Sequence, residues 1–298
     1  YAHPACPAEP PEQVPENIVR MAHLGRNLTD QHLCGGNTLS PLRNGDEAYP
    51  AMLEAIAAAR NHVFLATYIF NAGHTGTAFT EALAAAAARG VDVRVLVDGI
   101  GTLYSWRKPW KKLAARGIKV ALFLPPKLFP PNLSINLRNH RKVLVCDDIG
   151  FTGGMNISDD NIQSGRKSCV QDVHFRCLGP IVNQLRRAFL LNWGFCTGEY
   201  TPLPPGSGQI KGESHCRIVM DGPGNDADML NDLFCGAVNT ARRSVRIMTP
   251  YFLPTHDLMA SLRSAGQRGV DVRVVLPAKN NLPYVHWATF RLLPTLLN

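Results

Sequence analysis

Hydrophobic and polar residues alternate along the chain with two periods, one typical of helices and the other of strands. In the first hundred residues, alanine-rich stretches with helical spacing alternate with short, continuous apolar runs. The helical spacing predicts helices over residues 47–60 and 76–89, and the apolar runs predict strands over 62–70 and 91–98. A strand, a helix and a second strand in this order indicate a β-α-β unit.

The same order occurs a second time in the chain. Residues 89–97 read RGVDVRVLV and residues 268–276 read RGVDVRVVL, an offset of 179 residues. Each segment follows a helical pattern, and upstream of each lies an apolar strand that is itself preceded by a helix. This offset is too long for the period of a solenoid. It therefore indicates two copies of one α/β domain.

The remainder of the first copy is expected to hold further strands and two more helices. A basic helix is predicted near 107–116 and a strand over 118–124, followed by a proline-containing loop. We expect three more strands, one that carries His140, one across IGFTGG and one across DVHFRCLG. A helix over 181–193 closes the copy.

Composition marks the expected limits of the domains. Proline, glycine and serine are frequent in residues 197–214, which we interpret as a linker. The first domain then covers 42–196, and 215–298 form a second domain that is incomplete. Residues 1–41 are expected to form an arm with a short helix. The predicted fold class is α/β, with two tandem α/β/α sandwich domains, each a mixed sheet flanked by helices.

Charge favours anionic partners for this chain. Hydrophobic residues make up 45% of the sequence, enough for a core, while the formal net charge is +8 and the pI about 9.2. Such a balance suits nucleic acid or an acidic membrane and does not separate the two. The eight cysteines form no C-x-x-C pair, which argues against a zinc cluster. No window of 18 apolar residues predicts a membrane-spanning helix.

The stretch NHRKVLVCDDIGFTGGMN, residues 139–156, combines an apolar strand with polar groups. Residues i and i+2 of a strand point to the same face, so His140 and Lys142 are expected to project together. A neutral imidazole can attack phosphorus, and an ammonium group can neutralise phosphate oxygens. Two glycines that permit a close approach, and an asparagine amide, follow in the same stretch: Gly153, Gly154 and Asn156.

The pattern H-x-K-x4-D followed by G-G-x-N resembles the phospholipase D superfamily. Within it, residues 42–298 resemble bacterial cardiolipin synthases, for example in ARGVDVRVLVDGIG, VQDVHFRCLGPIV and TPYFLPTHDLMASLRSAGQRGVDVRVVLP. The resemblance implies that the histidine of one copy attacks a phosphodiester and forms a phosphohistidine. The histidine of the other copy protonates the leaving alcohol and deprotonates the incoming one. The resemblance implies no metal and no other cofactor.

Several residues acquire roles through this resemblance. His140 is the nucleophile or the acid/base, and Lys142, Gly154 and Asn156 bind the phosphate. The remaining two members of the predicted catalytic set are carboxylates. Asp172 matches an acidic residue that hydrogen-bonds the imidazole, whereas a charge at a strand edge is the alternative. Asp147 belongs to the motif, yet we expect it to accept local hydrogen bonds at the turn rather than to touch substrate. His174, two residues after Asp172, either faces the site or is a packed strand histidine.

The resemblance also indicates partners and location. An anionic phospholipid, phosphatidylglycerol in particular, is the expected substrate, a membrane surface is the expected partner, and nucleic acid is not expected. The chain is expected at the bacterial inner membrane, peripheral or anchored upstream of Tyr1, with the catalytic part cytoplasmic. Residues 106–112 and the loop from Leu124 are candidate lipid contacts. A basic helix start on the surface explains the first equally well, and for the second a loop packed on the second copy is the favoured alternative.

The implied mechanism needs two histidines, and the repeat offset puts the second near position 319, beyond Asn298. We therefore expect the chain to be a fragment of a longer protein. Two other readings stay open. One is a phospholipase or nuclease of the same superfamily, where a hydrolase differs from a transferase in admitting water. The other is a non-catalytic lipid- or nucleic-acid-binding scaffold. The oligomeric state is open.

Overall fold

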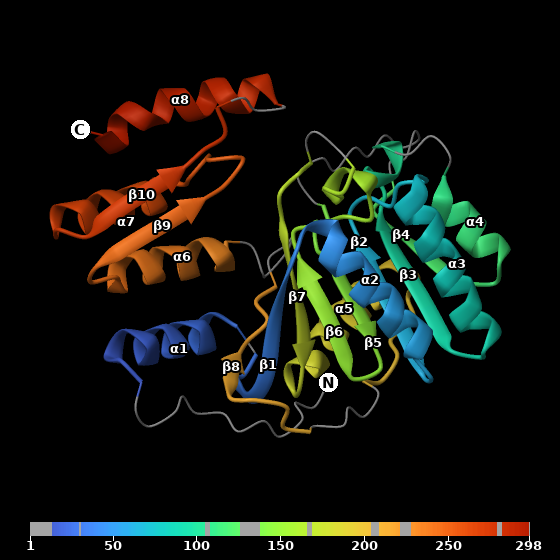
Figure 1. Cartoon of the computed structure of the whole chain (residues 1–298). Coiled ribbons are helices and arrows are strands. Elements are labelled where there is room, and N and C mark those ends of the chain that lie inside the picture. Colours follow the sequence, from blue (N-terminus) through green and yellow to red (C-terminus); the bar gives the residue numbers. More distant parts are fainter. Residues whose placement is uncertain are drawn as a thin grey trace. The chain divides into compact units, whose positions relative to one another are not determined.

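The computed structural model describes the residues 14–29, 31–104, 108–125, 138–165, 169–203, 209–220, 228–278 and 282–297. The chain divides into two compact units (Figure 1). The first unit contains residues 1–9 and 32–218, and the second contains residues 10–31 and 219–298. The predicted lipid-contacting loop lies mostly outside the described residues, as does the start of the predicted basic helix.

One eight-stranded mixed sheet forms the first unit, with the strand order β4-β3-β2-β5-β6-β7-β1-β8. Strands β2, β3 and β4 run parallel, whereas β5, β6, β7 and β1 pair with their neighbours in antiparallel fashion. The predicted mixed α/β class is therefore confirmed. The strands are β1 Cys34–Arg43, β2 His62–Thr67, β3 Asp92–Asp98, β4 Lys119–Phe123, β5 Val143–Cys146, β6 Ile149–Gly153, β7 Val173–Leu178 and β8 Ser214–Cys216.

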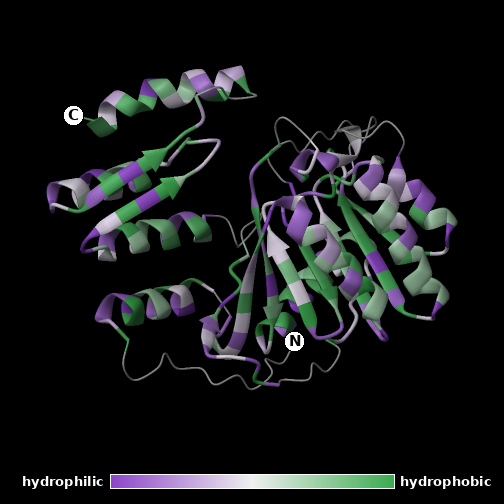
Figure 2. Ribbon diagram, in the orientation of Figure 1, coloured by the Kyte–Doolittle hydropathy of each residue, from purple (hydrophilic) through white to green (hydrophobic). Residues whose placement is uncertain are grey.

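Helices cover both faces of this sheet. One face packs against α2 (Asn44–Ala58), α3 (His74–Ala88) and α4 (Pro109–Ala115), and the other packs against α5 (Ile181–Thr197). Alternate residues of β2 serve the two cores, with Val63 on the first and Phe64 on the second. Burial on both faces explains why the strands read as continuous apolar runs. Figure 2 shows hydrophobic colour along much of β3 and β5, interrupted in β3 by hydrophilic bands.

The sequence pattern did not indicate β1, which lies between β7 and the edge strand β8. Its sequence CGGNTLSPLR has two glycines and a proline, which weaken the strand pattern. Pairing with β7 on one side and β8 on the other makes it a strand. The expected arm of residues 1–41 is consequently divided between the units, because α1 (Glu16–Leu28) belongs to the second unit. Residues 214–216, at the predicted end of the linker, form β8 of the first unit.

The second unit repeats the opening of the first. Its elements after α1 are α6 (Met229–Thr240), β9 (Ser244–Met248), α7 (His256–Gln267), β10 (Asp271–Val275) and α8 (Pro283–Leu297). Strands β9 and β10 pair in parallel, as β2 and β3 do, which confirms the predicted repeat. An aspartate at the first position of β3 and of β10 pairs with the arginine two residues later in both copies.

Among the described residues, no helix combines the length and the apolar character that crossing a membrane requires.

Stacked aromatic rings between sheet and helix make a specific prediction about stability. Phe189 of α5 stacks on Phe64 of β2 with ring centroids 5.0 Å apart, and Phe189 is almost fully buried. Phe189→Ala should lower the free energy of unfolding by about 3–5 kcal/mol, because it leaves a cavity. Phe195→Ala on the same helix removes a 59% exposed ring and is the matched control. Urea denaturation of both variants measures this, and equal losses would contradict the packing account.

Candidate functional site

The histidine and lysine of the motif lie next to each other immediately before β5. The nitrogen Nζ of Lys142 lies 3.0 Å from Nδ1 of His140 and donates a hydrogen bond to the backbone oxygen of His140 at 2.7 Å. The predicted projection to one side is thus confirmed. The expected strand is shorter than predicted, since β5 begins at Val143. Lys142 is 5% exposed, whereas His140 is open to solvent.

Tyr68 completes this pair, and the sequence analysis missed it. Its ring centroid lies 4.8 Å from that of the His140 imidazole, and Nζ of Lys142 lies 5.5 Å from the Tyr68 ring centre. Tyr68 directly follows β2, at the carboxyl end of the parallel strands. Ligand sites of open α/β sheets form at such ends. The sequence feature that could have identified Tyr68 is therefore an aromatic residue at the carboxyl end of an apolar strand.

A buried carboxylate supports the same place from the neighbouring strand. Asp98, the last residue of β3, is 1% exposed, and its Oδ2 accepts a hydrogen bond from the backbone N–H of Asn139 at 2.9 Å. Asn139 directly precedes His140. The sequence analysis also missed Asp98, although an aspartate at the end of a buried parallel strand is a recognisable signal.

The surroundings lower the pKa values of both residues of the motif pair. Burial lowers the pKa of Lys142 to about 8, against the opposing pull of the Asp172 and Asp98 carboxylates. Although His140 reaches solvent, partial desolvation of its ring by the neighbouring groups, together with the positive charge of Lys142, lowers the pKa of His140 to about 4. At neutral pH the imidazole is therefore uncharged and the ammonium is mostly protonated. An uncharged imidazole beside a cation is suited to attack at an anionic phosphorus centre.

Asp172 does not make the contact that the resemblance implied. Its carboxylate accepts the N–H of Val173 at 2.7 Å, and its backbone is paired with Asn44 of α2. No hydrogen bond joins Asp172 to His140, both of which are described residues. Burial raises the pKa of Asp172, and the charge of Lys142 opposes that rise. Asp172 therefore acts on the pair through its charge on Lys142.

The two glycines of the motif make room for the chain itself. A Cβ atom at Gly154 would clash with the carboxylate of Asp172, and one at Gly153 would lie 2.5 Å from the backbone oxygen of Val173 and 2.7 Å from Nδ1 of His174. We expected these glycines to admit a ligand, yet the Asp172 carboxylate and the backbone and imidazole at the start of β7 approach them instead. His174 is 1% exposed, so the reading as a packed strand histidine is confirmed.

Asn156 is held in one orientation by its neighbours. Its Oδ1 accepts the N–H of Ile69 at 3.1 Å, and its backbone oxygen accepts a hydrogen bond from the Tyr49 hydroxyl at 2.8 Å. With the amide oxygen occupied, the NH₂ group is the part of this side chain that can donate to a ligand. The phosphate-binding roles of Asn156, Gly154 and Lys142 stay predictions.

Asp147 lies at the far end of β5, in the turn to β6. Its carboxylate accepts the backbone N–H groups of Arg60, Asn61 and His62 at 2.8, 3.1 and 2.9 Å. Burial by itself would raise the pKa of Asp147, but these hydrogen bonds outweigh it and lower the pKa. The four residues of β5 separate Asp147 from Lys142, a span of about 16 Å between their Cα atoms in an extended strand. Asp147 thus accepts local hydrogen bonds, and the structure does not bring it to the His140–Lys142 pair.

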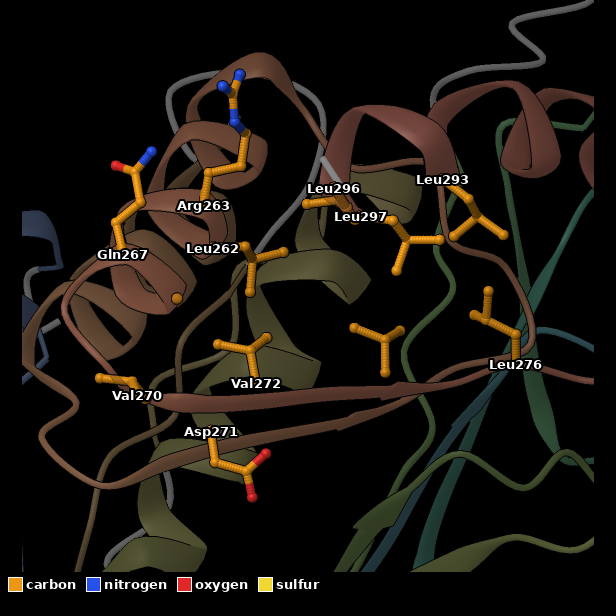
Figure 3. A pocket seen from close by; sticks show the side chains of 12 residues that line it. Leu262, Arg263, Gln267, Val270, Asp271, Val272, Leu276, Leu293, Leu296 and Leu297 are labelled. Carbon is orange, nitrogen blue, oxygen red and sulfur yellow. The ribbon is translucent and has the colours of Figure 1, made fainter.

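A separate groove in the second unit offers no such chemistry. It has a volume of about 750 Å³ and lies among α7, β10 and α8, lined mostly by leucine and valine side chains (Figure 3). No histidine, lysine or cysteine lines it. Nor does any group of three or more His, Cys, Asp or Glu side chains suited to a metal ion occur in the described part of the chain. The His140–Lys142 pair is therefore the candidate site.

Comparisons with known proteins point to the same family as the sequence motif. The family described as "Cardiolipin synthase, PLD-like domain" matches residues 52–193 and 234–298. The major cardiolipin synthase ClsA of Bacillus subtilis (strain 168) is 33% identical over 268 residues, 88% of this chain and 55% of the relative. The cardiolipin synthase of Alkalihalophilus pseudofirmus is 31% identical over 94% of this chain and 56% of the relative. The chain thus spans about half the length of these curated relatives.

A solved structure supports the fold. The phosphatidylserine synthase of Haemophilus influenzae Rd KW20 superposes with a TM-score of 0.64, over 91% of this chain and 72% of that one. At 14% sequence identity, this likeness concerns the fold alone.

The buried histidine of β7 predicts a pH dependence of stability. Burial, with the charge of Lys142, lowers the pKa of His174 to about 4, below the ordinary value of 6.5. The unfolded chain then binds more protons than the native protein between pH 6.5 and 4, so stability falls as the pH falls through this window. In the His174→Gln variant, this fall in the free energy of unfolding, on the order of 3 kcal/mol, should be absent. Urea denaturation at pH 7 and pH 4.5 measures it, with His256→Gln on exposed α7 as the control. A wild-type slope in the His174 variant would refute the assignment.

Proposed function

The chain belongs to the family of phospholipase D-like cardiolipin synthase domains, and on that premise we propose that its first unit supplies one half of a phosphatidyltransferase centre of the cardiolipin synthase type. The observation that supports this most directly is the uncharged His140 imidazole, 3.0 Å from the buried Lys142 ammonium. One group supplies an electron pair for phosphorus and the other a positive charge for its oxygens.

The proposed reaction proceeds in two displacements. An imidazole nitrogen of His140 attacks the phosphorus of a phosphodiester, a P–N bond forms, and the P–O bond to the leaving alcohol breaks as an acid protonates that alcohol. An acceptor alcohol, deprotonated by the same group, then attacks the phosphohistidine and releases the imidazole. The acid/base is a second histidine, which the repeat predicts near position 319. Splitting one hard step into two easier ones is the general advantage of a covalent intermediate.

The Lys142 ammonium group is proposed to exchange its hydrogen bond within the protein for one to the phosphate. In the structure, Nζ of Lys142 bonds the backbone oxygen of His140 and contacts its Nδ1. An arriving phosphoryl oxygen carries a full charge and competes better for the ammonium than a carbonyl or a neutral nitrogen. Transfer of this donor neutralises the phosphate and releases His140 Nδ1 from its contact. The amide NH₂ of Asn156 is the second proposed donor to the phosphoryl oxygens.

An anionic phospholipid is the proposed substrate, with phosphatidylglycerol as the acceptor. Curated relatives that bear the name cardiolipin synthase and the net charge of +8 both support this. An acidic membrane surface attracts a basic protein, and we propose peripheral or anchored attachment to the bacterial inner membrane, with the catalytic part cytoplasmic.

Hydrolysis of the same bond is the second candidate. Its support is the exposure of His140, because water that reaches a phosphohistidine competes with the acceptor alcohol. The products distinguish the two reactions, since a hydrolase releases phosphatidic acid where a transferase releases cardiolipin.

The decisive variant is His140→Gln in the complete protein encoded by the source gene. We expect phosphatidyl transfer to fall at least about 1,000-fold, since no other group of the pair can form the P–N bond. Labelled phosphatidylglycerol in vesicles provides the assay, and EDTA should leave the rate unchanged. His23→Gln, on exposed α1, is the control. Wild-type transfer by the His140 variant would exclude the proposed role of His140, whereas no transfer by the wild-type protein would favour a non-catalytic scaffold.

A further inference from the structure

The residues just before His140 belong to no strand, so another part of the chain must hold them. Asp98 holds them with one oxygen of its side chain and holds the turn after β3 with the other. Its Oδ1 accepts the N–H groups of Ile100 and Gly101 at 2.9 and 3.1 Å, and its Oδ2 accepts the N–H of Asn139 at 2.9 Å. One carboxylate thus ties the turn after β3 to the segment that carries His140, some 40 residues further along the chain.

Neighbouring contacts strengthen this tie. Nη1 of Arg138 lies 3.7 Å from Oδ1 of Asp98 and donates to the backbone oxygen of Leu124 at 2.9 Å. Asn139 is buried, and its Oδ1 accepts the N–H of Arg141 at 3.3 Å. The residues on both sides of His140 are therefore fixed, although His140 itself is open to solvent.

We propose that Asp98 is a positioning residue, whose buried carboxylate fixes the backbone at Arg138 and Asn139 so that His140 and Lys142 are presented together. The catalytic consequence rests on the function proposed above. The anchoring itself is a property of the first unit and can be measured without any reaction.

The need for a carboxylate rather than an amide follows from counting donors. Three N–H groups reach Asp98 from two directions, and each oxygen accepts at least one of them. An asparagine has a single acceptor oxygen. In Asp98→Asn the amide oxygen is expected to stay with the two donors of the turn, which leaves its NH₂ group against the N–H of Asn139. This substitution therefore breaks the tie to the His140 segment and preserves the turn.

Asp98 also acts through its charge, which favours the ammonium form of Lys142. Asp98→Glu separates the two effects. It keeps the negative charge, but an extra methylene displaces the carboxylate, so that the three short hydrogen bonds cannot all persist. A positioning role predicts that both variants disturb His140, whereas a purely electrostatic role predicts that only the asparagine variant does.

The experiment is an NMR titration of His140 in this chain, with the signal assigned by comparison with His140→Gln. The wild type should titrate near pH 4. In Asp98→Asn and Asp98→Glu we expect the midpoint to move up by about 1 unit or more toward the ordinary value of about 6.5, as the ring leaves Lys142. Asp92→Asn is the matched control, because Asp92 begins the same strand and pairs there with Arg94 and Lys119. Circular dichroism establishes that each variant is folded. An unchanged midpoint in either folded Asp98 variant would overturn the proposal.

An activity measurement in the complete protein separates this inference from the proposed function. We expect Asp98→Asn to lower kcat about 10- to 100-fold with little change in KM, because the reacting group is misplaced while the lipid contacts remain. Equal kcat in the Asp98→Asn and Asp92→Asn variants would overturn the positioning role. The titration shift in the Asp98 variants, combined with no phosphatidyl transfer by the wild-type complete protein, would refute the proposed function and leave the positioning role supported.

Discussion

A buried ammonium group is the constraint around which the candidate site is organised. Lys142 is 5% exposed, and removing a charge from water costs several kcal/mol unless nearby groups compensate. The compensation comes from the backbone oxygen and imidazole of His140, from the face of Tyr68, and from the charges of Asp98 and Asp172. The neutral state of His140 and the intermediate pKa of Lys142 both follow from this arrangement.

The three named residues of the motif divide into two kinds of task. His140 and Lys142 lie immediately before β5 and are the residues proposed to carry the chemistry. Asp147 lies at its end, where it accepts three backbone N–H groups. Beneath it, Arg186 is completely buried and donates to the backbone oxygen of Asp147 and to Nε2 of His62. A short apolar strand is therefore anchored at both ends, by Asp98 near the site and by Asp147 and Arg186 at the opposite turn.

The two glycines of the motif were correctly predicted to allow a close approach, but the group that approaches them was expected to be a ligand and is part of the protein. Glycine at 153 and 154 signals a close approach of another group to the backbone. The group is the β7 region, where Asp172 and His174 lie against β6. Of these two side chains, the Asp172 carboxylate also favours the ammonium form of Lys142 through its charge.

Local patterns in the sequence determined the elements with strong periodicity and the repeated helix-strand-helix-strand order. These properties depend on residues within a few positions of one another, so the chain needs no distant partner to express them. The tertiary structure alone decided that CGGNTLSPLR is a strand, because β7 and β8 supply its hydrogen bonds. It alone brought Tyr68 and Asp98 to the site and held Asp172 on Asn44 instead of on the imidazole. Those contacts join residues dozens of positions apart, and their geometry is set by strand register and turn conformation, which a pattern of residue types does not encode.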